Sequence, residues 1–290
     1  MKEQDQNQRF LFDEYPIRGQ HVSLDESWAR IVAQSKLEGR ALTLLGEALA
    51  AMVLLVDTLK IKGSVIFQVR GTGPLGLLVV EASSDQQIRG IARQDGVIDD
   101  DMPLQEVFGT DYFVITIKAE GAEPHQGIAT LKGHTLAEAL EHYFATSDQL
   151  ATRFWLACDA ENVSGLMLQK LPGKSSDEDA WNRVSMLADT LTAQELKLAE
   201  VNSLLLRLFH QEAVRLFEPS PVAYHCSCSR ERTAAMLVTL GKDEVLDVLS
   251  KEGDVSVTCE FCNENYRFDS IDVEQVFTNS SPVTATAREH

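Results

Sequence analysis

The chain has 290 residues, 44% hydrophobic and 24% charged, which is typical of a globular protein with a core of ordinary size. Its formal net charge of −18 disfavours nucleic acid as a partner, because binding to phosphates requires clustered Lys and Arg. The N-terminus is polar, and the longest apolar run, 48–56, is too short to cross a bilayer. We therefore expect a cytoplasmic protein without a secretory signal or a membrane partner.

Residues 1–171 are predicted to form an α+β domain with a largely antiparallel sheet and packed helices. Residues 1–20 are expected to be an edge segment or arm, and 40–60 a long buried helix, because apolar residues recur there at helical spacing. Thr135 and Glu138 form a capping box at the start of another helix. Apolar or β-branched runs between turn residues predict strands at 64–70, 75–81, 87–93, 111–118, 126–132, 153–160 and 164–171.

Residues 172–225 are predicted to be a helical linker that begins with turn-forming and small polar residues. Within it, 181–217 has an apolar face at helical spacing throughout, and Pro219 ends the helical segment. Thr192 and Glu195 form a second capping box in this segment. The face is too apolar for a free linker, so it must pack either on the first domain or on the cysteine-containing C-terminal module.

Residues 226–277 are predicted to be a small zinc-binding module, followed by a disordered tail at 278–290. Ser229 can cap a first helix, and 242–251 should form a second. A β-hairpin is expected at 255–267, with two cysteines in its turn.

Four of the five cysteines stand in two close pairs, Cys226 with Cys228 and Cys259 with Cys262. Four thiolates so grouped can bind one Zn²⁺ ion, and a structural zinc contributes about 10–16 kcal/mol in small modules. The remaining Cys158 lies in an apolar stretch and is expected to be a small buried hydrophobe rather than a nucleophile.

The same pairs are also ready disulfide partners, so spacing alone does not decide between a permanent zinc site and a redox switch. A disulfide within Cys226-Ser-Cys228 would be local and strained, which is typical of labile, regulatory disulfides. His225 is expected to be a surface or supporting residue; the alternatives are that it raises the reactivity of the neighbouring thiolate or serves as a spare ligand.

Several motifs point to one family, and they are distributed over nearly the full length, about residues 8–277. They are QVRGTGPL at 68–75, IRGIAR at 88–93, VITI at 114–117, LAEALE at 136–141, LFHQEAVRLF at 208–217, CSCSRER at 226–232, CEFC at 259–262 and YRFD at 266–269. In these motifs the chain resembles the 33 kDa chaperonin family of redox-regulated heat-shock chaperones.

The resemblance implies a holdase that needs no ATP, is not an enzyme, and protects cells from oxidative and heat stress. It implies a reduced, inactive monomer with zinc on Cys226, Cys228, Cys259 and Cys262. Oxidation would then form the disulfides Cys226–Cys228 and Cys259–Cys262, release zinc, loosen the linker and give a homodimer that binds unfolded client proteins.

We place the client-binding surface, as a hypothesis, on the apolar face of the linker. The alternative is that this face stays packed on the N-terminal domain. The residues are Leu204, Leu205, Leu208, Phe209, Leu216 and Phe217.

Three rival functions are weighed against this one. A thiol oxidoreductase would need Cys259-x-x-Cys262 between a strand and a helix, whereas a hairpin is predicted. A zinc ribbon for nucleic acid conflicts with five Lys/Arg against eleven Asp/Glu in 226–277. A constitutive structural zinc protein differs only in not releasing its metal on oxidation.

Overall fold

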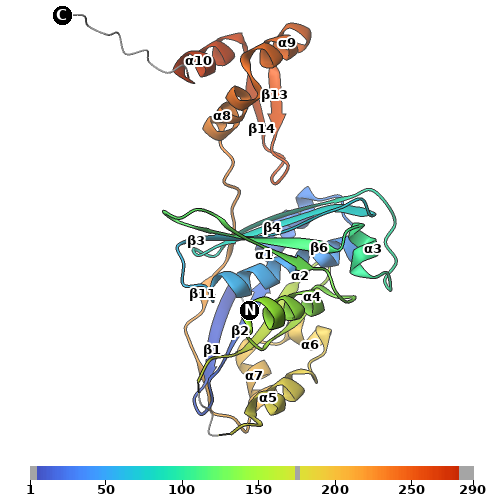
Figure 1. Cartoon of the computed structure of the whole chain (residues 1–290), viewed down its shortest axis with the longest axis vertical. Coiled ribbons are helices and arrows are strands. Elements are labelled where there is room, and N and C mark those ends of the chain that lie inside the picture. The colour runs from blue at the N-terminus through green and yellow to red at the C-terminus, as the bar shows by residue number, and fades with distance from the viewer. Residues whose placement is uncertain (1–4, 174–176, 281–290) are drawn as a thin grey trace, which may run out of the picture. The chain divides into compact units, whose positions relative to one another are not determined.

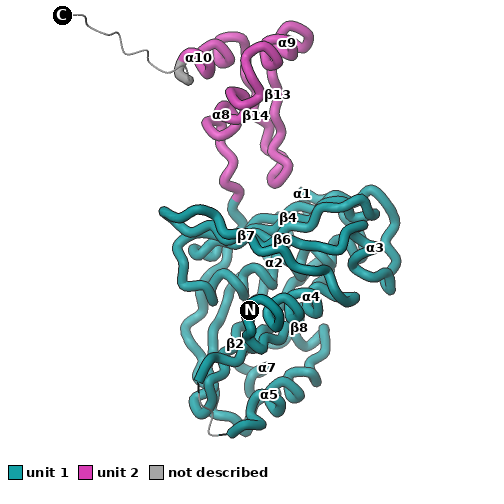
Figure 2. Tube along the Cα trace, viewed as in Figure 1, with its two compact units in different colours: residues 1–225 teal, residues 226–290 magenta. Residues whose placement is uncertain are grey.

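The computed structural model of the protein describes residues 5–173 and 177–280, and the chain forms two compact units (Figures 1 and 2). The first unit comprises residues 1–225 and the second residues 226–290.

The first unit contains two six-stranded sheets rather than the single sheet expected. Sheet A has the order β10-β1-β2-β9-β8, with β11 also paired to β1, and its pairs are antiparallel. Its strands are β1 (Gln6–Phe12), β2 (Ile17–Leu24), β8 (Thr152–Cys158), β9 (Val163–Lys170), β10 (Val214–Leu216) and β11 (Ser220–Pro221). The expectation of an N-terminal edge segment is wrong for the described residues, because β1 lies between β2 and β10.

Sheet B has the order β12-β5-β4-β3-β6-β7, and only the β12–β5 pair is parallel. Its strands are β3 (Gly63–Arg70), β4 (Leu75–Ser83), β5 (Gln87–Gln94), β6 (Tyr112–Ala119), β7 (His125–Thr130) and β12 (Ala223–Tyr224). The strands predicted between 64 and 132 are confirmed to within two residues at each end.

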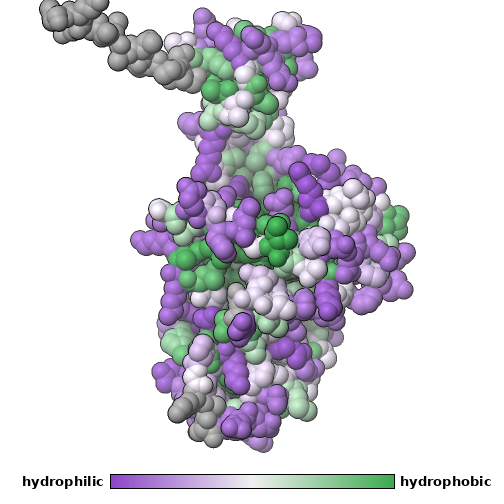
Figure 3. Space-filling view, in the orientation of Figure 1, coloured by the Kyte–Doolittle hydropathy of each residue, from purple (hydrophilic) through white to green (hydrophobic). Residues whose placement is uncertain are grey.

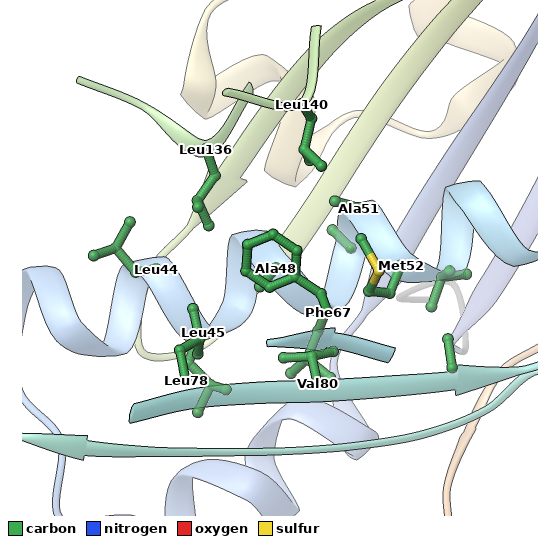
Figure 4. Close-up of a cluster of buried hydrophobic side chains, with 14 of the residues drawn as sticks. Leu44, Leu45, Ala48, Ala51, Met52, Phe67, Leu78, Val80, Leu136 and Leu140 are labelled. Atoms are coloured by element: carbon green, nitrogen blue, oxygen red, sulfur yellow. The ribbon is translucent and has the colours of Figure 1, made fainter. Parts of the chain in front are cut away.

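Helix α2 (Gly39–Val56) packs against strands of both sheets and is the centre of the main core (Figure 4). It is apolar on nearly all sides, as a helix enclosed between two layers must be. Its 18 residues are long and apolar enough to cross a membrane, but 78% of them are buried inside the protein, which is typical of a core helix. The remaining helical elements of this part are α1 (Glu26–Gln34), α3 (Leu104–Phe108), α4 (Leu136–Tyr143) and a π-helical turn (Phe144–Asp148).

The linker segment belongs to the first unit and covers sheet A. Its helices are α5 (Ala180–Ala188), α6 (Ala193–Leu198) and α7 (Val201–Phe209). The prediction of helix throughout 181–217 is wrong, because the chain becomes extended after Phe209 and adds β10 and β11 to sheet A and β12 to sheet B. The capping boxes predicted at Thr135 and Thr192 are both confirmed.

The second unit is a small α+β module with a core of its own. Its elements are α8 (Arg230–Leu240), α9 (Lys242–Glu252), β13 (Val255–Thr258), β14 (Asn265–Phe268) and α10 (Ser270–Ser280). Ser229 caps α8 and β13 pairs with β14, both as predicted. Helix α10 was not predicted and extends into the expected disordered tail, whose residues 281–290 lie outside the described part.

Candidate functional site

The four paired cysteines converge in the second unit, and all of their Sγ atoms lie within 4.8 Å of one another. The Sγ atoms of Cys226 and Cys259 are 3.7 Å apart, and those of Cys228 and Cys262 are 3.3 Å apart. A tetrahedral zinc site with bonds of about 2.3 Å has sulfur–sulfur edges of about 3.8 Å. The donor set and its spacing therefore fit a metal ion of this kind, and all four thiols are free.

Hydrogen bonds shape the two short segments that carry the cysteine pairs. The turn of the hairpin is closed by Cys259 N–H donating to Glu264 O at 2.8 Å and by Asn263 N–H donating to Cys259 O at 2.9 Å. Asn263 takes a left-handed φ of +57°, which Asn tolerates better than most residues. The first pair is fixed by Arg232, whose Nη1 donates to Ser227 O at 2.7 Å.

Tyr266 contacts the cluster directly, which was not predicted from the sequence. Its hydroxyl donates to Cys228 Sγ at 3.1 Å. Burial works against ionisation of Cys228, but hydrogen bonds, led by that of Tyr266, lower the pKa of its thiol. Tyr266 lies on β14, four residues after Cys262. Because side chains alternate along a strand, its position in the predicted hairpin was the available signal in the sequence for a contact with the cysteines.

Two of the other thiols favour the protonated form in the absence of a cation. Burial raises the pKa of Cys226 and of Cys262 above the usual value for a thiol. Four thiolates at this spacing would repel one another strongly, so a bound cation would be needed to stabilise the fully ionised set.

The other two sequence candidates lie in the first unit. His225 is exposed, and its backbone N–H donates to Ile88 O at 3.0 Å. Cys158 is half-buried against the main core, and burial raises the pKa of its thiol. Its raised pKa makes it a poor nucleophile, in line with the expected packing role.

The proposed client surface is packed on sheet A. Leu204, Leu205, Leu208 and Phe209 are each at most 5% exposed, whereas Leu216 is half-buried and Phe217 is 37% exposed. The ring of Phe209 lies 5.1 Å from that of Phe12 and 6.3 Å from that of Phe10. The apolar face of the linker is thus mostly covered in this structure, in which the cysteines form no disulfide.

Ion pairs contribute little to this docking. Lys197 of α6 pairs with Asp159, and Arg153 of β8 pairs with Asp189 at 2.8 Å. Such partly exposed pairs contribute about 0–1 kcal/mol each. Burial of the apolar face must therefore supply most of the docking free energy.

Two polar groups under α6 oppose its docking. His21 of β2 is 1% exposed, and neither ring nitrogen has a well-formed hydrogen bond within the described residues. Burial lowers its pKa to about 4, and a backbone group of Leu196 offsets this only in part. Glu47 of α2 lines a cavity of about 230 Å³ that Leu196 also lines, and burial raises its pKa to about 7.

His21 and Glu47 are expected to change docking in opposite directions as the pH falls. A released His21 takes up a proton near pH 6.5, whereas the docked ring does so only near pH 4, so the His21 contribution to docking stability is intact above pH 6.5 and is lost as the pH falls towards 4. Protonation of Glu47, whose docked pKa is about 7, instead removes a buried charge and favours docking. Between pH 7 and pH 5 the loss due to His21 alone should be about 2 kcal/mol. Urea unfolding followed by tryptophan fluorescence measures it as the difference in pH dependence between the native protein and His21→Leu, which lacks this component. The same pH dependence in the two proteins would contradict the assignment.

The comparisons with known proteins agree over nearly the whole chain. The family model described as Hsp33 protein matches residues 5–269. A 33 kDa chaperonin of Nitrosococcus oceani is 45% identical over 99% of both chains, and one of Vibrio parahaemolyticus is 40% identical over 94% of this chain and 95% of its own. The crystal structure of a 33 kDa chaperonin from Thermotoga maritima has a TM-score of 0.80 at 23% identity and covers 95% of this chain and 98% of its own.

The fold and the site define an α+β protein with a C-terminal four-cysteine module able to hold a metal ion. The family model and the curated relatives together show that the chain belongs to the Hsp33 family. Membership supports a role as a chaperone, a class of proteins that act by binding rather than by catalysis.

Proposed function

We propose that the protein is a redox-regulated, ATP-independent holdase of the cytoplasm, whose reduced form binds one Zn²⁺ ion through Cys226, Cys228, Cys259 and Cys262. The observation that carries the proposal is the convergence of four free thiols within 4.8 Å of one another. Bound zinc would supply the charge that holds the thiolates together. The metal would join the two cysteine pairs, and oxidation would replace it by two disulfides, one within each pair.

The proposed disulfides join Cys226 to Cys228 and Cys259 to Cys262. In each pair, one thiolate attacks the O–O bond of peroxide, becomes a sulfenic acid and releases hydroxide; the second thiol then displaces water and closes the disulfide. Two electrons leave each pair and one peroxide is consumed. Two sulfur–sulfur contacts of 3.7 Å and 3.3 Å join the pairs, and oxidation within the pairs would remove the metal that links the first loop to the hairpin.

Loss of that link should unfold the module. Its own core consists of Leu237, Val245, Val255, Phe268 and Val273, with a few half-buried neighbours. A core of this size supplies only about 3–5 kcal/mol, well below the roughly 10–16 kcal/mol of a structural zinc site.

We further propose that unfolding of the module leads to release of the linker and exposure of its apolar face to unfolded clients. His21 and Glu47 support this step, because both oppose docking of the segment that would have to leave sheet A. The proposal includes a monomer when reduced and a homodimer when oxidised, and it includes no nucleic acid, membrane or enzymatic role.

The test is to treat the reduced, zinc-loaded full chain with peroxide and to follow three quantities together. We expect one zinc released, four thiols lost and suppression of aggregation of a heat-unfolded protein. Mapping of disulfides by mass spectrometry should give the two local bridges rather than bridges between the pairs. If peroxide releases no zinc, or if release leaves client aggregation unchanged, the site is a permanent structural zinc site instead.

A further inference from the structure

Strand β7 forms one edge of sheet B, and within the described part of the chain it pairs only with β6. The pairing fixes which backbone groups face outward. Leu131 N–H donates to Asp111 O at 2.8 Å, so the backbone groups of Leu131 point towards β6. Because backbone groups alternate along an antiparallel strand, those of Gly127 and Ala129 also point towards β6. The N–H and C=O groups of Gln126, Ile128 and Thr130 therefore face away from the sheet.

This edge is open. Gln126, Ile128 and Thr130 are all exposed, and the Ile128 side chain is 71% exposed. Figure 3 has the same orientation as Figure 2, in which β6 and β7 are labelled. It shows hydrophobic side chains on the surface over these two strands. An incoming strand would thus find backbone partners along the edge and an apolar side chain beside them.

The usual protections of an edge strand are missing from β7. Proteins block such edges with Lys, Pro, bulges or inward charges. Residues 125–130 contain no Lys, Arg, Asp, Glu or Pro, and their six pairs with β6 run without a shift in register. An unprotected, regular edge of this kind is a template for another extended chain.

We propose that the β7 edge binds an extended segment of an unfolded client, which adds to sheet B as a further strand. Main-chain pairing does not depend on sequence, which suits a chaperone that meets many different unfolded chains. A second copy of this protein is the less favourable occupant, because each chain carries a net charge of −18. The inference rests on the proposed holdase function and adds a binding site distinct from the linker face.

The direct test is backbone amide exchange by NMR on the full chain, reduced and peroxide-treated, with carboxymethylated α-lactalbumin as a permanently unfolded client. We expect the amides of Gln126, Ile128 and Thr130 to become at least tenfold more protected when the client binds. The amides of Gly127 and Ala129 already face β6 and should change little.

Variants separate pairing at the edge from contact with the face of the sheet. Ile128→Pro removes an outward N–H and should weaken client binding about tenfold, whereas Ile128→Thr keeps that N–H and should stay within about threefold. Val114→Thr removes an apolar side chain from the neighbouring strand, paired with Ile128, and should have no larger effect than Ile128→Thr. Ile128→Lys, which leaves the backbone intact, should also weaken binding and covers the case in which the proline variant does not fold.

The outcomes distinguish the edge site from the proposed function. Client binding without protection of the three outward amides overturns the edge site and leaves the holdase function standing. Protection that appears without client and grows with protein concentration identifies a second copy as the occupant and overturns the proposal. No client binding in either redox state overturns both.

Discussion

Replacing Cys262 by serine is expected to abolish stable zinc binding and to unfold the second unit. The Cys262 Sγ lies 3.3 Å from that of Cys228, and its loss leaves only three thiols to hold a metal ion between the two segments. Zinc affinity should fall by more than about 100-fold, because a structural site takes four protein ligands. Zinc content by mass spectrometry and the dispersion of amide signals from residues 226–280 measure the two effects.

Cys158→Ser is the matched control for this change. Cys158 belongs to the first unit and packs against the main core, far in sequence from the four ligands. Its variant should keep one zinc per chain and a folded module. A Cys262→Ser protein that retains stoichiometric zinc and a dispersed spectrum would show that the four-thiol site does not hold the module together.

Phe209→Ala is expected to release the linker in the reduced protein, without any oxidant. Phe209 is 2% exposed and packs against the rings of Phe10 and Phe12. Truncating a buried Phe costs about 3–5 kcal/mol, a large loss for a segment that is docked mainly by its apolar face. Hydrogen exchange should accelerate across residues 201–224, and the reduced variant should suppress client aggregation.

Leu206→Ala provides the control on the same helix. Its side chain is 69% exposed, so its removal should change stability by less than about 0.5 kcal/mol and leave the reduced protein inactive. A Phe209→Ala protein whose linker exchanges rapidly but which still fails to bind clients would move the client-binding surface away from the linker face.

Local signals in the sequence were sufficient for much of the fold. The capping boxes at Thr135 and Thr192, the cap at Ser229 and the hairpin that carries Cys259 and Cys262 all depend on residues close in sequence, and all are confirmed. The convergence of the four thiols was also predicted, because spacing alone places each pair on one short turn. Tyr266 was missed because its contact with Cys228 joins residues 38 positions apart.

The errors have a common cause in pairing over long sequence distances. Strand β10 is three residues long and exists because it pairs with β1, some 200 residues earlier in the chain. Its apolar residues fit a helix equally well, so the spacing of apolar residues in the sequence could not distinguish a helix from a strand here. The single sheet expected proved to be two. The all-round apolar surface of α2 was a signal that layers cover it on both sides, but which strands join which sheet depends on pairing between segments far apart in sequence.

The extended end of the linker has a mechanical consequence. Its strands β10, β11 and β12 are held by three, two and two residue pairs, and they succeed one another along the chain. Tension applied at the C-terminal end would break these short ladders one after another instead of all together, so the segment would peel away in steps. Detachment in stages would expose the apolar face of the linker to an extent that increases with the severity of the stress, instead of exposing all of it at once.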